Sequence, residues 1–210
     1  MGIIGGEFEI NKRYFIETGS TQSFKFKDGY FYSSGRAALY HILLFSIKNG
    51  KEKILLPDYL CESIIEIVKI LKIQFYFYKI NEDLTTNIDS IKDIYEEDCS
   101  VLIINYFGGI EVSKEIKKLR KIDLNISIIL DNVQALDNMF KSLDVDFMFT
   151  SFRKQLPVPD GGWVISKYKL DKCEGHNTFA QYKLAGGLLK NFQGYKSISD
   201  KTYLELFKKG

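Results

Sequence analysis

Residues 101–107 read Val-Leu-Ile-Ile-Asn-Tyr-Phe, and the pair Gly108-Gly109 follows directly. An apolar run without alternating polar residues is typical of a strand that is covered on both faces, as strands of parallel sheets are. The two glycines mark the end of the strand. The stretch therefore predicts a central strand of a parallel sheet over residues 101–107.

Helix and strand patterns alternate on both sides of this strand. Before it, the apolar residues predict a buried helix over 37–47, a strand over 54–56, a helix over 64–71 and a strand over 75–78. After it, they predict helices over 111–121 and 199–210, and strands over 126–130, 147–152 and 162–166. Short strands that alternate with helices of this length indicate an open, mainly parallel α/β sheet.

The composition is that of an ordinary globular protein with one sizeable core: 210 residues, 45% hydrophobic and 27% charged. The net charge is only +2, with acids and bases interleaved, so we expect no nucleic-acid partner. The most apolar stretch, residues 54–78, is interrupted by charged side chains, so we expect no membrane partner. Residues 1–7 lack the basic and apolar segments of a signal peptide.

The cysteines, Cys61, Cys99 and Cys173, are odd in number and widely spaced. This pattern argues against a disulfide framework and favours a reducing cytoplasm. Cys173 and His176 lie close together in the sequence, but no second pair completes a zinc site. We therefore expect no metal centre.

Ligands of open α/β sheets bind at the carboxyl ends of the strands. The polar residues at or just beyond the ends of the predicted strands are therefore the candidates for a site. They are Asn105, Asp131, Ser151 and Lys154, to which we add the turn Ser33-Ser34-Gly35-Arg36 that opens the first long helix.

The turn before the first helix has two interpretations. Small residues before a helix leave backbone N–H groups free at the positive end of the helix dipole, an arrangement that suits a phosphate. Ser34 can equally well be a simple N-cap residue. The sequence leaves both interpretations open.

Asp131 ends a predicted buried strand, where an acid is costly unless a partner stabilises its charge. A protonated pyridine nitrogen is such a partner, since an ionised carboxylate keeps the ring protonated and able to draw electrons from a substrate. The alternative is that Asp131 caps the following helix.

Lys154 lies just beyond a strand that ends near Ser151. Its amine could react with an aldehyde cofactor, while Ser151 and Arg153 hold a phosphate on that cofactor. The alternative is a solvated basic turn in a lysine-rich chain.

Taken in order, these segments resemble the DegT/DnrJ/EryC1 family of sugar aminotransferases from Gly5 to about Lys190. The matching segments are Ser34 to Leu39, Leu55-Leu56-Pro57-Asp58-Tyr59, Asn105-Tyr106-Phe107-Gly108, Leu130-Asp131-Asn132-Val133-Gln134-Ala135, and Ser151-Phe152-Arg153-Lys154 with Gly161-Gly162 beyond.

The resemblance implies a three-layer α/β/α sandwich with a mainly parallel mixed sheet, the large domain of pyridoxal-phosphate (PLP) dependent transferases. It implies that Ser34, Gly35, Arg36, Ser151 and Arg153 hold the cofactor phosphate. Asp131 would pair with the pyridine nitrogen, Gln134 would contact the ring hydroxyl, and Asn105 would lie in the pocket. Tyr59 or Cys61 would stack on the ring.

Lys154 would be the lysine that forms the Schiff base. In the family the lysine commonly comes five positions after the serine, whereas Lys154 comes three positions after Ser151. Counted from Ser151, Leu156 falls at the lysine position; counted back from Gly161, Lys154 does.

The implied function is amino transfer from glutamate to a nucleotide-linked keto-sugar, in a homodimer. A dehydratase of the same family would carry a histidine at the lysine position, and neither His41 nor His176 lies in that loop. The alternative function is not enzymatic: the protein would keep the fold as a binding or assembly module without catalytic activity. We expect residues 1–190 to form the cofactor domain and 191–210 to begin the connection to a C-terminal domain that is missing or truncated.

Overall fold

The structure is a computed structural model that describes residues 8–11, 26, 28–172, 178–193 and 200–209. The segment examined for a signal peptide, residues 1–7, lies outside the described residues, and so does the Cys173 and His176 pair.

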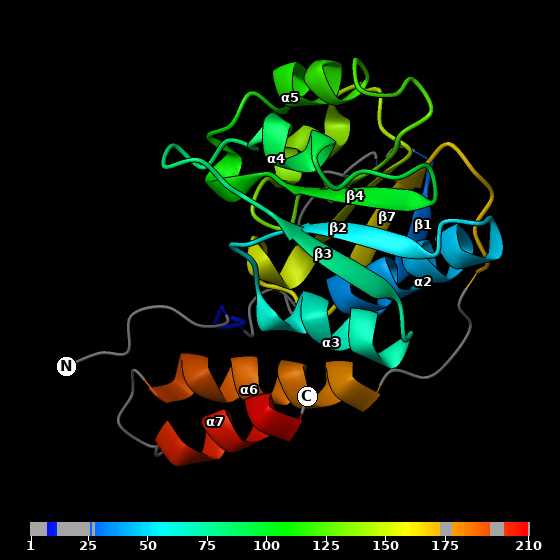
Figure 1. The fold of residues 1–210 in the computed structure, drawn as a ribbon. Coiled ribbons are helices and arrows are strands. Elements are labelled where there is room, and N and C mark those ends of the chain that lie inside the picture. The colour runs from blue at the N-terminus through cyan, green and yellow to red at the C-terminus, as the bar shows by residue number, and fades with distance from the viewer. Residues whose placement is uncertain (1–7, 12–25, 27, 173–177, 194–199, 210) are drawn as a thin grey trace.

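One mixed sheet of seven strands forms the centre of the molecule (Figure 1). Its order is β1-β7-β6-β5-β4-β2-β3. The five strands from β3 to β6 run parallel, β7 is antiparallel to β6, and β1 is antiparallel to β7. The strands are β1 (Tyr30–Tyr32), β2 (Lys53–Pro57), β3 (Gln74–Tyr78), β4 (Cys99–Ile104), β5 (Ser127–Asp131), β6 (Phe147–Ser151) and β7 (Gly162–Ser166).

Helices cover both faces of this sheet, which confirms the predicted three-layer sandwich with a mainly parallel mixed sheet. Figure 1 shows α2 and α3 on one face and α4 and α5 on the other. Their bounds are α2 (Gly35–Lys48), α3 (Glu62–Ile70), α4 (Ile88–Lys92) and α5 (Val112–Leu119). Three short 3-10 turns follow strands: η1 (Tyr106–Gly108), η2 (Leu136–Phe140) and η3 (Phe152–Lys154).

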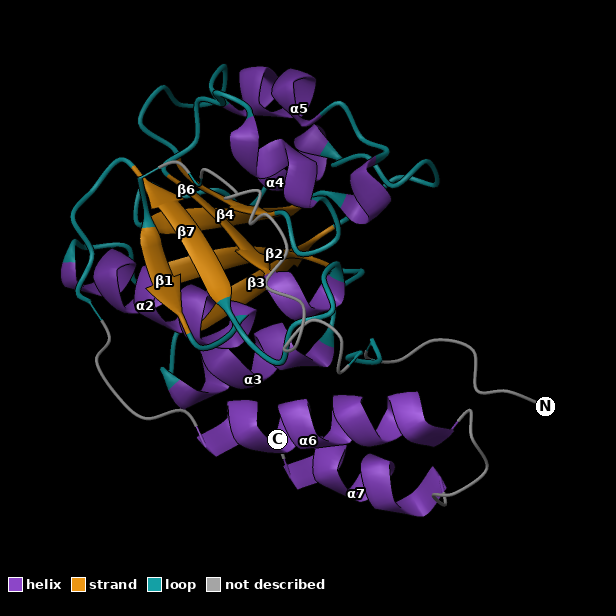
Figure 2. Cartoon of the chain, turned by 180° about the vertical axis from the view of Figure 1, so that it is seen from behind, coloured by secondary structure: helices purple, strands orange, loops and turns teal. Residues whose placement is uncertain are grey.

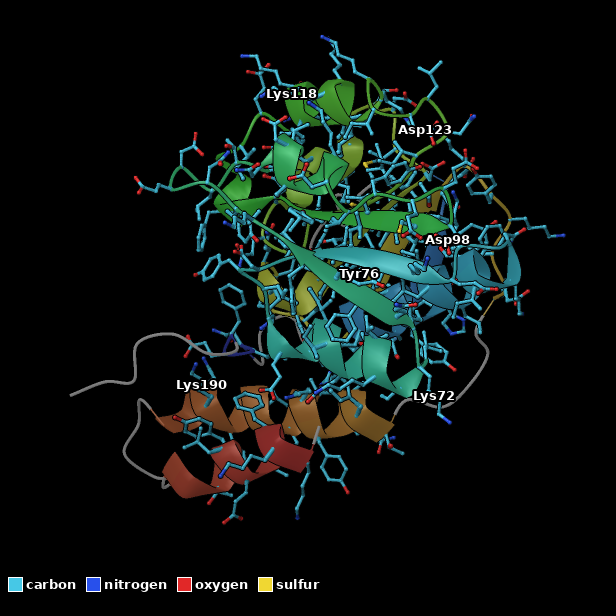
Figure 3. The ribbon with its side chains drawn as sticks, viewed as in Figure 1. Lys72, Tyr76, Asp98, Lys118, Asp123 and Lys190 are labelled. Carbon is cyan, nitrogen blue, oxygen red and sulfur yellow. The ribbon has the colours of Figure 1, made fainter. Side chains whose placement is uncertain are left out.

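The alternation of side chains along β4 explains why its sequence is apolar throughout. Leu102 and Ile104 pack into the core beneath α2 and α3, whereas Val101 and Ile103 pack into the core beneath α4 and α5. Successive strand residues point to opposite faces, so a strand covered on both faces has no position for a polar residue. Lys118 of α5 faces solvent (Figure 3), whereas Glu115 of the same helix is buried.

The central strand is shorter than the sequence pattern predicted. It ends at Ile104 instead of Phe107, and the chain then enters η1. Phe107 and Gly108 both have positive φ, 53° and 70°, which turns the chain away from the sheet. Hydrophobicity alone does not reveal this turn, because Tyr106 is buried after the strand has ended.

Two further helices, α6 (Thr178–Gln193) and α7 (Asp200–Lys209), pack side by side, and α6 is drawn below α3 with α7 beyond it (Figures 1 and 2). Gly186 of α6 permits this packing, since a Cβ there would lie 2.7 Å from the Phe207 ring. The boundary predicted after residue 190 falls within α6, and the division of the chain there stays a prediction. None of the described helices is long and apolar enough to cross a membrane.

Candidate active site

A cavity of about 650 Å³ lies at the carboxyl ends of β4, β5 and β6, beside the first turns of α2 and α3. The residues predicted for the site that line this cavity are Ser34, Gly35, Arg36, Tyr59, Asp131, Gln134, Ser151, Arg153 and Lys154. Ser33 and Asn105 do not line it. Segments far apart in the sequence therefore meet at the edge of the sheet where the strand pattern placed the ligand.

Asn105 lies behind the cavity wall rather than in it. Its side chain is fully buried, and its Nδ2 donates to Asn132 Oδ1 over 3.3 Å. Its backbone N–H donates to the carbonyl oxygen of Asp131 over 3.0 Å. In the structure Asn105 therefore helps to hold the end of β5. The sequence pattern had instead predicted that it lies in the pocket.

The N-terminus of α2 is held tightly against the end of the sheet. Ser34 is the N-cap residue, and its Oγ accepts a hydrogen bond from the Ala37 N–H over 3.1 Å. A Cβ on Gly35 would lie 2.9 Å from Ser151 Cβ, and a Cβ on Gly162 would lie 2.2 Å from Ser34 O. Only glycine permits these approaches. Ser34 is thus an N-cap residue in a turn that also lines the cavity, and phosphate binding by this turn stays a prediction.

Arg36 forms an ion pair that the sequence did not reveal. Its Nη1 lies 3.5 Å from Oε2 of Glu66, which comes from α3 and also lines the cavity. Both side chains are about half exposed, at 50% and 54%. The guanidinium is therefore in the cavity wall but directed to a carboxylate of the protein.

Asp131 is the acid at the floor of the cavity. Only 6% of it is exposed, and Oδ1 accepts one hydrogen bond, from the Val133 N–H at 2.8 Å. Burial raises the pKa of Asp131 to about 7, and the Val133 hydrogen bond opposes this rise. A cation brought to this carboxylate would restore its charge, because an opposite charge favours the ionised form.

Two aromatic residues of η1 complete the wall and were not predicted. The Tyr106 ring is tilted by 31° against the Tyr59 ring at 5.5 Å between centroids, and its hydroxyl donates to the Tyr59 carbonyl. Burial raises the pKa of Tyr106, so the hydroxyl stays protonated as a donor. The Phe107 N–H donates to Gln134 Oε1 over 3.1 Å, which leaves the amide nitrogen of Gln134 as a donor. The glycines after Phe107 were the only sequence signal for this turn.

The loop after β6 separates the two candidates for the lysine position. Lys154 ends η3, is exposed and lines the cavity. Leu156 instead packs against the hydrophobic core beneath α4 and α5. Cys61 lines the cavity together with Tyr59, so both remain candidates for the ring-stacking residue. In the part of the chain that the structure describes, no three His, Cys, Asp or Glu side chains are grouped to hold a metal.

Comparison with known sequences finds no match to any protein-family model or to any curated protein. Solved structures do match. The sugar aminotransferase CalS13 from Micromonospora echinospora matches with a TM-score of 0.54 and 14% identity over 79% of this chain. The putative sugar aminotransferase Spr1654 from Streptococcus pneumoniae, in its PLP form, matches with a TM-score of 0.56 and 15% identity over 79% of this chain. The sphingosine-1-phosphate lyase Bpss2021 from Burkholderia pseudomallei matches with a TM-score of 0.55 and 12% identity over 84% of this chain.

These matches show that the chain has the fold of the large domain of PLP-dependent fold-type I enzymes, which include aminotransferases and lyases. The chain spans about half the length of these neighbours, between 45% and 49% of each. At such low identity the likeness shows the fold alone, and function has to be argued from the site.

Proposed function

We propose that this chain binds pyridoxal 5'-phosphate in the cavity and attaches it through Lys154, as the cofactor-binding part of an aminotransferase. The observation that carries the proposal is the composition of one cavity. It brings together a buried acid, an accessible lysine and the N-terminus of a helix.

The acid fits the ring end of this cofactor. Asp131 is buried, has one hydrogen bond from Val133, and has a pKa raised to about 7. Among the described residues that line the cavity, none forms an ion pair with this carboxylate. A protonated pyridine nitrogen would supply the missing positive charge. Asp131 would hold the proton on that nitrogen. Gln134 would donate its amide N–H to the ring hydroxyl.

The opposite end of the site fits a phosphate. The first N–H groups of α2, at Gly35 and Arg36, lie at the positive end of the helix dipole, where anions are stabilised. Ser151 is packed against Gly35, and Arg153 lines the same wall. These residues would fix the phosphate and so orient the rest of the cofactor.

Lys154 is the residue that would do chemistry. When bound, pyridoxal phosphate supplies an electron-withdrawing ring that stabilises negative charge on a substrate carbon. The Lys154 amine is a nucleophile toward an aldehyde, and once released it can accept and return a proton at Nζ. Its exposed position at the cavity wall leaves the amine accessible to the cofactor and to the substrate.

The substrate class rests on the resemblance and on the neighbours. We propose a nucleotide-linked keto-sugar as acceptor and glutamate as amino donor, in a homodimer in the cytoplasm. The resemblance to sugar aminotransferases and the structural match to CalS13, a sugar aminotransferase, support this choice. Light scattering at several concentrations tests the homodimer, and a strict monomer would contradict it.

The test is to trap the cofactor on its lysine. The protein is mixed with pyridoxal phosphate, reduced with borohydride and digested, and the labelled peptide is identified by mass spectrometry. We expect label on Lys154 and its complete loss in Lys154→Ala. Lys167→Ala is the matched control, because Lys167 lies near the opposite edge of the sheet and pairs with Asp144 at 2.6 Å. Label on another lysine overturns the assignment, and absence of any label favours the non-catalytic binding module.

A further inference from the structure

The position of Arg36 requires an anion. Arg36 is the second residue of α2, and the first turn of this helix contains no acidic residue. A cation at a helix N-terminus is disfavoured by about 0.3–1 kcal/mol, because the dipole is positive there. The guanidinium therefore needs a negative partner from elsewhere.

Glu66 of α3 supplies that partner, but only loosely. The contact is a single one of 3.5 Å between two half-exposed side chains, and exposed pairs of this kind contribute about 0.2–1 kcal/mol. Glu62 precedes Glu66 by one helical turn on the same cavity wall, and like charges at this spacing disfavour each other. The Arg36–Glu66 pair is thus easily exchanged for a better one.

A phosphate is a better partner for Arg36 than Glu66 is. It carries more charge than a carboxylate and offers three oxygens, so a guanidinium binds it through two parallel hydrogen bonds. It would also occupy the N-terminus of α2, beside Arg36 itself. The anion would therefore relieve the unfavourable dipole interaction that Glu66 offsets in its absence.

We propose that Glu66 is an exchangeable counter-ion that holds Arg36 until a phosphate-bearing ligand takes its place. Glu66 is then a positioning residue that lowers the affinity of the site for phosphate without touching the ligand. Arg36 is the residue that discriminates phosphorylated from unphosphorylated ligands. This inference rests on the proposed function, because it assumes that the phosphate binds at the N-terminus of α2.

The experiment compares pyridoxal phosphate with pyridoxal, which has the same aldehyde but no phosphate, and adds inorganic phosphate as a competitor. Glu66→Gln should tighten pyridoxal phosphate by about 1.5- to 5-fold, the range that an exposed ion pair gives. Its affinity for pyridoxal should not change. Arg36→Gln should weaken pyridoxal phosphate by about tenfold, as expected for a charged hydrogen bond, and adding Glu66→Gln to it should have no further effect.

Glu62→Gln is the matched control, since it removes an equal charge from the same helix and cavity wall. Equal tightening by both glutamate variants would mean a general charge effect and would overturn the exchange. An unchanged affinity in Glu66→Gln overturns it as well. If pyridoxal phosphate binds Lys154 but Arg36→Gln has no effect, the exchange is wrong while the proposed function stands. If neither aldehyde nor phosphate binds, both fail together.

Discussion

Two buried aspartates lie at opposite ends of the same sheet and have different surroundings. Asp131 ends β5 at the carboxyl edge, and Asp146 precedes β6 at the amino edge. The exposed fraction is 6% for Asp131 and 7% for Asp146. Asp146 accepts hydrogen bonds from Arg120 at 3.2 Å, from the Ile128 N–H at 2.9 Å and from the Tyr168 hydroxyl at 3.0 Å. Asp131 accepts one, from the Val133 N–H.

The difference separates a carboxylate that serves the fold from one that is available to a ligand. The charge of Asp146 is compensated inside the protein, by a guanidinium that also ties Asp144 and two backbone carbonyls to α5. The charge of Asp131 is not compensated, which is costly for a buried acid unless a ligand supplies a cation. Burial alone therefore does not indicate a functional acid, whereas burial with few partners makes Asp131 a candidate for one.

The largest effect expected is on catalysis and distinguishes the two aspartates. Asp131→Asn should keep the fold and reduce amino transfer by about a thousandfold, or ~4 kcal/mol, because a neutral amide cannot hold the ring nitrogen protonated. Asp146→Asn should instead lower the free energy of unfolding by about 3 kcal/mol, because Arg120 loses a buried charged partner. Single-turnover amino transfer from glutamate and urea unfolding measure the two effects.

The comparison fails if the effects are exchanged. Parent-rate amino transfer by Asp131→Asn in protein that carries the cofactor would remove the pyridine partner from its proposed role. Strong destabilisation by Asp131→Asn would show that Asp131 also serves the fold.

The second effect is the part of the pH dependence of stability that comes from Asp131. The folded-state pKa of Asp131 is about 7, above the value of ~3.9 for an unfolded chain. Between these values the folded state binds more protons than the unfolded state, so stability falls as the pH rises. We expect the cofactor-free protein to lose about 2–3 kcal/mol between pH 5 and pH 7 through this group. Asp131→Asn should abolish that part of the slope, as followed by urea unfolding at each pH.

The third effect concerns the geometry that makes the cavity possible. Gly162→Ala should cost about 2 kcal/mol, because its Cβ would lie 2.2 Å from Ser34 O and force the N-terminus of α2 away from the sheet. Gly109→Ala is the control, since its Cβ would meet nothing closer than Tyr106 O at 3.9 Å. Thermal unfolding of both variants is the measurement. Equal costs would mean that the close packing at Gly162 is not needed.

The elements that the sequence predicted well are those in which local pattern and burial agree. The strand over 162–166 matches β7, and the helix over 37–47 lies within α2. The three-residue edge strand β1 was missed because its pattern is too short to show a period. Helix α6 was missed because its apolar residues are distributed with little periodicity and Gly186 and Gly187 interrupt them.

The site was predictable where chain order carries the information and unpredictable where tertiary packing does. Asp131, Ser151 and Lys154 were expected to lie together, and do line one cavity, because each lies at or just beyond a strand end and strand ends meet at one edge. The Arg36–Glu66 pair joins two helices whose relative position depends on how they pack, so no local pattern reveals it. Asn105 met the same strand-end criterion, yet it is buried behind the wall because the strand turns away after Ile104.

The smallest effect expected comes from Phe179, whose ring links α6 to the cavity edge among the described contacts. The Phe179 ring of α6 lies 5.8 Å from Cζ of Arg153, and Nζ of Lys183 lies 5.3 Å from the same ring. Lys183 also donates to the carbonyl of Phe207 in α7 over 2.7 Å, so α7 is tied to this ring through one lysine. Phe179 thus contributes to the placement of a guanidinium that lines the cavity.

Phe179→Leu keeps the apolar volume but removes the aromatic face that attracts the two cations. A cation–π contact at a partly exposed position contributes about 0.5–1 kcal/mol, so pyridoxal phosphate should bind about two- to fivefold more weakly. Pyridoxal should bind unchanged, because Arg153 acts on the phosphate alone. Phe207→Leu is the control: its ring lies 5.4 Å from Nζ of Lys183, so this variant should loosen the packing of α7 on α6 without changing the affinity for the cofactor. Equal weakening by both variants would show that α6 and α7 act through the stability of their packing and not through the contact between Phe179 and Arg153.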